Sequence, residues 1–227
     1  MKIICIGGGP GGLYFAISMK LRNPEHEITV VEQNKPHDTF GWGIVFSDQT
    51  LENLQLNDPE SAETIRKSFA YWDDIDVHIH GKVVRSGGHG FIGIGRLRLI
   101  TILQDRAEKL GIKQVYETQV ETSDNYENYD LVVASDGINS KIRTQHEEHF
   151  QPDIDLRRNK FIWLGTHKLF EAFTFIFIKT EHGWIWAHAY RFADDLSTFI
   201  VECSPETWNA LGFEEMSKEE AIGFLES

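Results

Sequence analysis

Residues 1–12 read MKIICIGGGPGG, and this stretch decides the fold that the sequence predicts. An apolar run leads directly into glycines at positions 7, 9 and 12, and a helical pattern begins at Leu13. A strand, a glycine-rich turn and a helix in this order are typical of a dinucleotide-binding βαβ unit. Gly7 would make the tight turn, Gly9 would let a pyrophosphate approach the backbone, and Gly12 would let the helix pack closely on the sheet.

An acidic residue further along the chain strengthens this interpretation. The apolar segment 28–31 predicts a second strand that ends next to Glu32. Glu32 follows Gly12 at a distance of about 20 residues, the spacing of a carboxylate that hydrogen-bonds a ribose hydroxyl. A carboxylate at this position disfavours the 2′-phosphate of NADP. The alternative is an apolar strand with an unrelated surface glutamate, and position, spacing and flanking patterns together argue against it.

Composition and charge exclude several classes of protein. The 227 residues are 41% hydrophobic and 25% charged, which is ordinary for a soluble globular chain. The net charge of −13 argues against binding to nucleic acid or to an anionic membrane. The apolar runs are too short to span a bilayer, and the N-terminus does not resemble a signal peptide.

Cysteine and histidine usage points to a cytoplasmic protein without a metal. The two cysteines, Cys5 and Cys203, form neither a disulfide framework nor a metal motif, so a reducing compartment is expected. His78 and His80 would share one face of a strand, but they have no carboxylate or cysteine partner at ligand spacing. We therefore predict no metal site.

The pattern along the chain predicts an α/β fold in two parts. A Rossmann-type domain is expected over residues 1–155, with inserted hairpin and loop elements at about 70–95, and an incomplete antiparallel or mixed sheet over 156–227. Helices are predicted at 13–21, at 49–71 with an interruption near Pro59, at 96–110 and at 217–226. Strands are predicted at 114–117, 131–134, 161–164, 173–179, 183–192 and 197–203.

One predicted strand has two contrasting faces. Trp184, Trp186, His188 and Tyr190 alternate with small apolar residues, so the large side chains share one face. That face could be core packed under a helix layer, or one wall of a cavity for an aromatic substrate. The sequence alone leaves both alternatives open.

A second signature, DGINSKIR, occupies residues 136–143 after the apolar strand at 131–134. Asp136 would lie at the carboxyl end of that strand, where ligands bind in open α/β sheets. Gly137 would permit close approach, and Asn139 or Ser140 would cap the next helix. The alternative is a helix cap with no ligand.

Together, GGGPGG, Glu32, the helix that opens at Arg96 and DGINSKIR resemble the single-component FAD-dependent aromatic hydroxylases. Longer stretches look like the branch of this family that acts on aryl-CoA thioesters, and hydroxylases of tryptophan-derived pigment precursors are nearly as similar. These stretches are FGWGIVFSDQTL at 40–51, the segment 87–112, RRNKFIWLGTHKLFEAFTFIF at 157–177 and STFIVECSPETW at 197–208. The resemblance spans nearly the whole chain.

The resemblance implies an FAD site and assigns residues to it. Gly7, Gly9 and Gly12, with Pro10 and Gly11 between them, would line the pyrophosphate. Glu32 would hold the adenosine ribose, Arg96 or alternatively Arg98 would reach the phosphate or ribityl region, and Val120 would offer backbone groups to the adenine. Asp136 would lie on the pyrophosphate side, and Trp42 and Gly43 would lie near the isoalloxazine.

The implied reaction is hydroxylation of an aromatic substrate, expected to be an aryl-CoA thioester, with NAD(P)H as transient electron donor and dioxygen. The resemblance identifies no catalytic base. The family carries a further Gly-Asp-Ala motif, and no Gly-Asp dipeptide occurs here. We therefore expect the N-terminal part of a longer hydroxylase, with self-association through an incomplete sheet. The alternatives are a non-catalytic dinucleotide-binding fragment and an NAD-dependent dehydrogenase, the latter leaving DGINSKIR unexplained.

Overall fold

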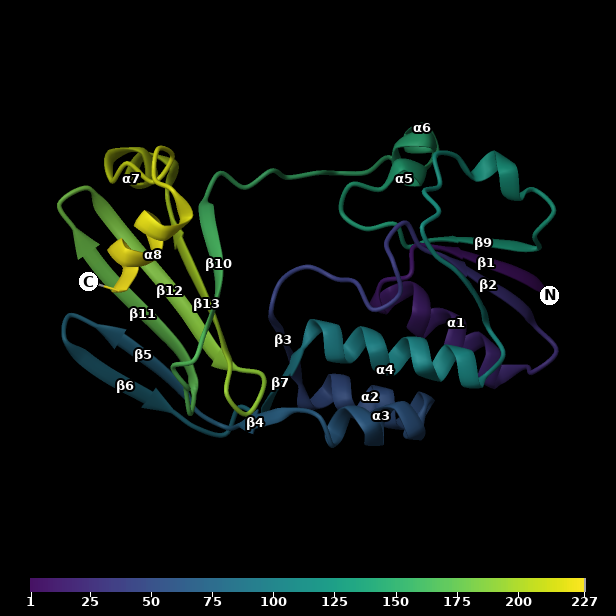
Figure 1. Ribbon diagram of the computed structural model, residues 1–227, viewed down its shortest axis with the longest axis horizontal. Helices are drawn as coiled ribbons and strands as arrows, with labels where there is room; N and C mark the ends of the chain where they lie inside the picture. Colours follow the sequence, from purple (N-terminus) through teal and green to yellow (C-terminus); the bar gives the residue numbers. More distant parts are fainter. Residues whose placement is uncertain (227) are drawn as a thin grey trace. The chain divides into compact units, whose positions relative to one another are not determined.

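The computed structural model describes residues 1–226, which divide into two compact units (Figure 1). Unit 1 consists of residues Met1–Phe40, Phe46–Phe69 and Ile94–Ile154. Unit 2 consists of Gly41–Val45, Ala70–Gly93 and the chain from Asp155 onward. The hairpin region, which the sequence assigned to the first domain as an insertion, therefore lies with the C-terminal segment.

Unit 1 is built on a parallel sheet with strand order β8-β2-β1-β9. The strands are β1 (Lys2–Ile6), β2 (Glu27–Val31), β8 (Lys113–Val115) and β9 (Leu131–Ala134). The central strand β1 is apolar throughout because it is buried on both faces, and Ile3, Ile4 and Cys5 have no exposed surface. This parallel sheet confirms the predicted α/β class for unit 1.

Helices α1 (Pro10–Arg22) and α4 (Arg96–Lys109) pack against each other and against strands of this sheet (Figure 1). The predicted apolar stripe of α4 is buried, from Leu99 to Ala107. The remaining helices of unit 1 are α2 (Asp48–Asn57), α3 (Pro59–Arg66), the short 3₁₀ helix η1 (Ser123–Tyr126), α5 (Lys141–Gln145) and α6 (Glu147–Phe150).

The junction between α2 and α3 contains a buried residue that makes an ionic contact with α4. Pro59 begins α3, as the predicted interruption required, and Asp58 precedes it with 1% of its surface exposed. Arg106 of α4 donates two hydrogen bonds to the Asp58 carboxylate, at 2.9 and 3.0 Å. Ser61 donates a third, at 2.5 Å.

The helical stretch predicted at 49–71 ends sooner than expected, at Arg66. The chain from Ala70 to Trp72 instead forms strand β4 and pairs with residues 91–93.

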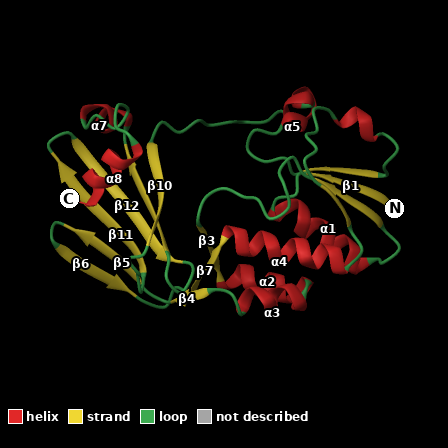
Figure 2. Ribbon diagram, viewed as in Figure 1, coloured by secondary structure: helices red, strands yellow, loops and turns green. Residues whose placement is uncertain are grey.

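Unit 2 contains a six-stranded mixed sheet with order β10-β13-β12-β11-β5-β6 (Figure 2). The strands are β5 (Ile75–Ile79), β6 (Lys82–Ser86), β10 (Lys160–Thr166), β11 (Phe173–Thr180), β12 (Gly183–Arg191) and β13 (Ser197–Cys203). Within this six-stranded sheet the β11–β5 pair is parallel and the other pairs are antiparallel. This long-range pairing explains why the predicted hairpin, β5 and β6, belongs to unit 2. A smaller sheet has the order β3-β7-β4, with β3 at Gly43–Ser47 and β7 at Phe91–Gly95.

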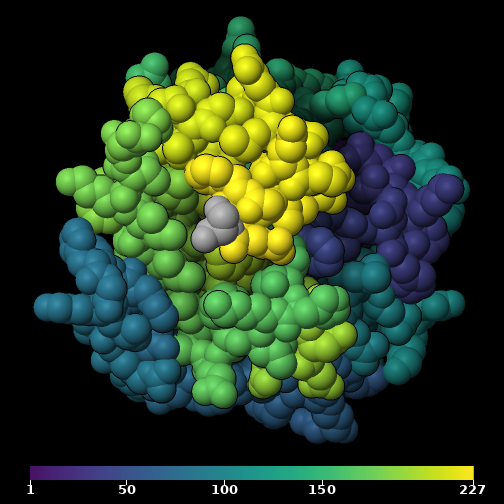
Figure 3. Space-filling view, turned by 60° about the vertical axis from the view of Figure 1, so that its left-hand side comes forward, coloured from purple at the N-terminus to yellow at the C-terminus, as the bar shows by residue number. Residues whose placement is uncertain are grey.

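One face of the six-stranded sheet is covered by helices α7 (Pro205–Ala210) and α8 (Lys218–Glu226). The C-terminal segment that carries them is the continuous yellow surface in Figure 3. Under it lie Ile185, Ala187, Val201 and Cys203, the small apolar side of β12 and its neighbour. The large side chains of β12 therefore lie on the opposite face. No helix among residues 1–226 is long and apolar enough to cross a membrane.

The Asp58–Arg106 contact predicts a measurable loss of stability. Burial by itself would raise the pKa of the Asp58 carboxyl, but the hydrogen bonds from Arg106 and Ser61 outweigh burial and hold that pKa below its usual value. A depressed carboxyl pKa stabilises the fold at neutral pH, and this contribution is lost as the pH falls through the folded-state pKa. Arg106→Leu should lower the free energy of unfolding by about 3 kcal/mol at pH 7.

Urea denaturation of wild type and variant measures this loss, and the difference should shrink under acid conditions. Lys109→Leu is the matched control, because Lys109 lies on the same helix, is exposed, and contacts Glu60 at 3.6 Å. Its cost should stay below about 1 kcal/mol. Equal costs for the two variants would contradict a structural role for the buried contact.

Candidate functional site

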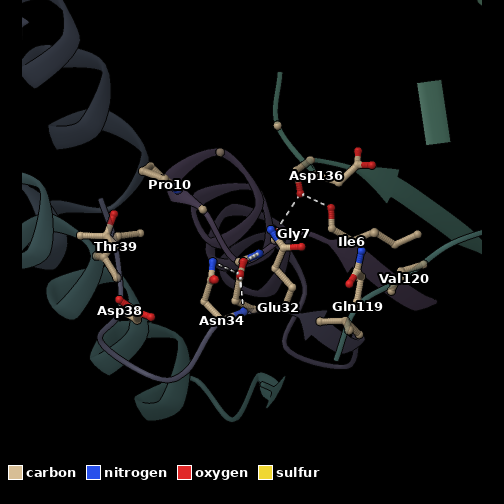
Figure 4. A pocket seen from close by; sticks show the side chains of 18 of the residues that line it. Ile6, Gly7, Pro10, Glu32, Asn34, Asp38, Thr39, Gln119, Val120 and Asp136 are labelled. Carbon is tan, nitrogen blue, oxygen red and sulfur yellow. Dashed lines mark hydrogen bonds between the residues drawn. The ribbon is translucent and has the colours of Figure 1, made fainter. Parts of the chain in front are cut away.

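Unit 1 contains a pocket of about 610 Å³ beyond the carboxyl ends of β1, β2 and β9 (Figure 4). Its volume lies within the usual range for ligand pockets. Ligands of open α/β sheets bind at this edge, where the strands end and the helices begin. The lining includes residues 6–11, 31–34, 38–40, 118–120 and 135–139, with Arg96, Ile100, Gln104 and Lys141.

The glycine turn is held by a close approach between backbone segments. Gly7 has a φ of +106°, and a Cβ at this position would overlap the backbone of Ser135. A Cβ on Gly12 would overlap the Gly7 carbonyl oxygen and the Ser135 hydroxyl. That hydroxyl lies 2.9 Å from the carbonyl oxygens of both Ile6 and Gly7. Gly12 is buried and does not line the pocket, so its part in the site is close packing.

Gly9 and Gly11 face open space. Gly9 is the N-cap of α1 with an ordinary φ of −69°, and nothing lies within 4 Å of a Cβ built there or on Gly11. Pro10 occupies the first helical position, where its missing N–H costs no hydrogen bond. The first turn of α1 thus presents backbone N–H groups and a partial positive charge beside an unobstructed part of the pocket, which suits a phosphate group.

Glu32 ties the end of β2 to the glycine turn, as Figure 4 shows. One carboxylate oxygen accepts a hydrogen bond from the Gly8 N–H at 2.7 Å. The other oxygen accepts from the Asn34 backbone N–H at 2.8 Å and from its side-chain amide at 2.7 Å. Because an ionised carboxylate has about four acceptor positions, Glu32 keeps capacity for one further donor, such as a ribose hydroxyl.

Asp136 lines the pocket and also caps a helix. Its carboxylate accepts hydrogen bonds from the Ser140 hydroxyl at 2.6 Å and the Lys141 N–H at 2.8 Å. Of the two predicted cap residues, Ser140 is the N-cap of α5 and accepts from the Arg143 N–H. Asp136 therefore has a helix-capping role and also lines the pocket, and its contact with a ligand stays a prediction.

The two arginine alternatives at the start of α4 separate in the structure. Arg96 lines the pocket, and its guanidinium carbon lies 4.4 Å from the centre of the Phe40 ring. Arg98 does not line this pocket, and its Nε donates to the Ser68 hydroxyl at 3.1 Å. Val120 lines the pocket from an extended segment, which is anchored by a hydrogen bond from the Thr118 N–H to the Glu32 carbonyl oxygen.

Trp42 and Gly43 lie in unit 2. The Trp42 indole lies where a Cβ on Gly165 would otherwise be, and the Gly43 N–H donates to the Thr198 hydroxyl at 3.0 Å. No cluster of three or more histidine, cysteine or acidic residues in the described chain could hold a metal ion.

Sequence reasoning missed polar residues that shape the pocket. Gln104 is 5% exposed on the buried stripe of α4, and its side-chain oxygen accepts from the His37 N–H at 3.1 Å. A glutamine at a core position is an anomaly that could have marked it. Ser135 directly follows β9, and Asn34 lies in the loop after β2. Short polar residues are common in such loops, so neither residue carried a distinct signal.

A parallel βαβ sheet with a glycine turn and an acid at the end of β2 defines the class of dinucleotide-binding folds. Solved structures of oxygenases share this fold. The chain aligns with 2-methyl-3-hydroxypyridine-5-carboxylic acid oxygenase at a TM-score of 0.77 and 17% identity, over 90% of this chain and 59% of the other. It aligns with PqsL of Pseudomonas aeruginosa, described as a probable FAD-dependent monooxygenase, at a TM-score of 0.69 and 14% identity, over 93% and 62%.

Sequence relatives carry the comparison further, although no family model matches the chain. It is 41% identical to salicyloyl-CoA 5-hydroxylase of a Streptomyces species, over 98% of this chain and 43% of the relative. It is 34% identical to protodeoxyviolaceinate monooxygenase of Chromobacterium violaceum, over 99% and 61%. The chain is thus homologous to part of these aromatic monooxygenases, and the resemblance predicted from the sequence is confirmed. It spans less than two thirds of the length of either relative.

A substitution at Gly9, which faces open space, should affect ligand binding, whereas one at Gly12, which is closely packed, should affect stability. Gly9→Val should leave the fold intact, because Gly9 has an ordinary φ and no neighbour near its Cβ. It should weaken binding of FAD, the dinucleotide that the resemblance implies, by more than about tenfold, the equivalent of one lost hydrogen bond to a charged group. Gly12→Val should instead destabilise the fold by about 2 kcal/mol or more through overpacking.

Quenching of FAD fluorescence measures the affinity, and thermal denaturation measures the stability. Gly223→Val is the control, because a Cβ on Gly223 of α8 also meets open space, far along the chain in unit 2. Loss of stability in Gly9→Val would contradict the open space around Gly9. Normal FAD affinity in that variant would contradict the prediction that a phosphate of the ligand occupies this space.

Proposed function

We propose that this chain is the FAD-binding and substrate-binding part of a monooxygenase that hydroxylates an aromatic substrate. One observation carries the proposal: a single pocket combines the open first turn of α1 with a Glu32 carboxylate that keeps an acceptor position. Those are the two features that a bound adenine dinucleotide requires, for its pyrophosphate and its ribose. Homology to aromatic monooxygenases supports FAD over NAD as the dinucleotide.

The residues present fit FAD. Gly9, Pro10 and Gly11 would hold the pyrophosphate at the helix terminus, Glu32 would accept from the ribose, and Val120 would offer its backbone to the adenine. Arg96 would lie toward the phosphate or ribityl region, Gly7 would shape the turn, and Asp136 would fix the adjoining loop. FAD, when bound, supplies the redox chemistry that activates dioxygen with electrons from NAD(P)H. The protein binds the cofactor, orients the substrate and excludes water.

The proposed substrate is an aryl-CoA thioester. The support is the 41% identity to a salicyloyl-CoA 5-hydroxylase. A 3-hydroxy-4-methyl-anthranilyl-[aryl-carrier protein] 5-monooxygenase of Streptosporangium sibiricum, 30% identical over 89% of this chain and 57% of the relative, also has a carrier-bound aromatic group in its name. Identity to protodeoxyviolaceinate monooxygenase favours a pigment precursor as the second candidate.

We further propose a division of labour between the two units. Unit 1 would be the FAD-binding domain predicted at 1–155, and unit 2 the substrate domain predicted at 156–227, with residues 70–93 joined to it. A cytoplasmic location stays a prediction that the two free cysteines support. Self-association stays a proposal, for which the tetrameric form of the 2-methyl-3-hydroxypyridine-5-carboxylic acid oxygenase is a precedent.

A labelling experiment tests the proposed reaction. The chain is incubated with FAD, NADH or NADPH, salicyloyl-CoA and isotopically labelled dioxygen, and the product is analysed by mass spectrometry. The proposal predicts a hydroxylated product that carries one labelled oxygen atom. Glu32→Ala should reduce its formation by about tenfold or more at limiting FAD, because the ribose contact and the link to Gly8 are lost.

Glu25→Ala is the control, since Glu25 is an exposed residue outside the pocket. FAD binding without any labelled product from salicyloyl-CoA would contradict the hydroxylation of an aryl-CoA thioester by this chain and favour the non-catalytic fragment. NAD binding without FAD affinity would favour a dehydrogenase.

A further inference from the structure

The face of the six-stranded sheet opposite α7 and α8 carries a row of large side chains. We call it the aromatic face. The strand register places four residues side by side across it: Trp163 of β10, Ile200 of β13, His188 of β12 and Phe175 of β11. The next row contains Phe161, Glu202, Trp186 and Phe177. A surface of flat rings this dense suits a flat aromatic ligand.

His188 and Glu202 form a polar pair within the aromatic face. They are diagonal neighbours, because His188 is opposite Ile200 while Glu202 is opposite Trp186. The His188 Nδ1 lies 3.9 Å from a carboxylate oxygen of Glu202, and the two side chains are 22% and 29% exposed. The pair is therefore partly exposed to solvent and not sealed in the core.

The surroundings of His188 determine its protonation. Its ring centroid lies 6.1 Å from those of both Phe173 and Phe175. Burial lowers the pKa of the imidazole, and the Glu202 carboxylate opposes only part of this effect. At neutral pH the imidazole is therefore neutral, with one nitrogen as donor and the other as acceptor.

Tyr190, the other polar side chain predicted for this strand, is already committed to the fold. It is buried, its hydroxyl donates to the Gly43 carbonyl oxygen at 2.8 Å, and its ring stacks on Trp72. Tyr190 is thus part of the core, as one of the two sequence alternatives held. His188 differs, because it is partly exposed and its contact with Glu202 is longer than a hydrogen bond.

We propose that His188, oriented by Glu202, recognises a hydroxyl substituent on the aromatic ring of the substrate, while the ring itself packs on the aromatic face. This inference rests on the proposed function and names the residue that selects the substrate. The Glu202 carboxylate favours a donor N–H on Nδ1, which leaves Nε2 as the acceptor for the ring hydroxyl. A ring without the hydroxyl would leave this acceptor without a partner on binding, and such a mismatch is what discriminates against an analogue.

The test compares two ligands that differ by the hydroxyl alone. Calorimetric titration of the FAD-loaded chain with salicyloyl-CoA and with benzoyl-CoA gives two dissociation constants, and their ratio is the readout. In the wild type, salicyloyl-CoA should bind about tenfold more tightly, as one hydrogen bond provides. In His188→Phe the ratio should fall to about one, because the stacking surface remains and the acceptor is gone.

Two further variants separate recognition from folding. Glu202→Gln should reduce the ratio in part, since Nδ1 loses its charged partner and the imidazole is less well oriented. His78→Phe is the matched control, because His78 is opposite Ile176 and so lies on the face covered by the helices. It should leave the ratio unchanged. Since a ratio within one variant cancels any general loss of folded protein, misfolding alone does not reproduce the predicted pattern.

Each remaining outcome contradicts the inference in a distinct way. An unchanged ratio in His188→Phe overturns the role of His188 while leaving the proposed function intact. Retained FAD with equal affinity for the two thioesters in the wild type overturns hydroxyl recognition on this face. A shift in oligomeric state in His188→Phe with an unchanged ratio would make the face a contact between copies. A wild type that binds neither FAD nor either thioester overturns the proposed function itself.

Discussion

The site depends on a close approach between three backbone segments at the end of β1. Gly7 turns the chain with a positive φ, Gly12 brings the first turn of α1 against the Gly7 carbonyl oxygen, and Ser135 lies beyond β9 with its hydroxyl between two carbonyl oxygens. A Cβ at Gly7 or Gly12 would not fit between these segments. Because this contact fixes where α1 begins, it also decides that the open N–H groups of the helix face the pocket.

The Glu32 carboxylate extends this constraint across the sheet. Its bonds to Gly8 and Asn34 join the end of β2 to the glycine turn, so one residue both shapes the pocket and keeps an acceptor for a ligand. Unit 2 combines structure and recognition differently. Tyr190 is held by the Gly43 carbonyl oxygen, whereas His188 remains partly exposed beside Glu202. In unit 1 one carboxylate both holds the fold and keeps an acceptor position, whereas in unit 2 Tyr190 holds the fold and His188 stays partly exposed.

The sequence predicted what local patterns determine. GGGPGG, the spacing to Glu32, the apolar stripe of α4 and the alternation in β12 all have a short-range physical cause, and each matches the structure. The parallel pairing of β5 with β11 joins segments far apart in the sequence, so the position of residues 70–93 in unit 2 could not be predicted. Likewise, Gln104 and Ser135 act through distant backbone partners, and residue type alone does not reveal such contacts.

The visible absorbance spectrum of the purified chain, after incubation with FAD and desalting, tests the central claim most directly. A flavin bound in the pocket of unit 1 should survive desalting and show the flavin bands at close to one equivalent per chain. The account predicts this result for the wild type. Complete loss of the flavin bands on desalting, from a chain that is folded by circular dichroism, would contradict the claim that these residues form an FAD site by themselves.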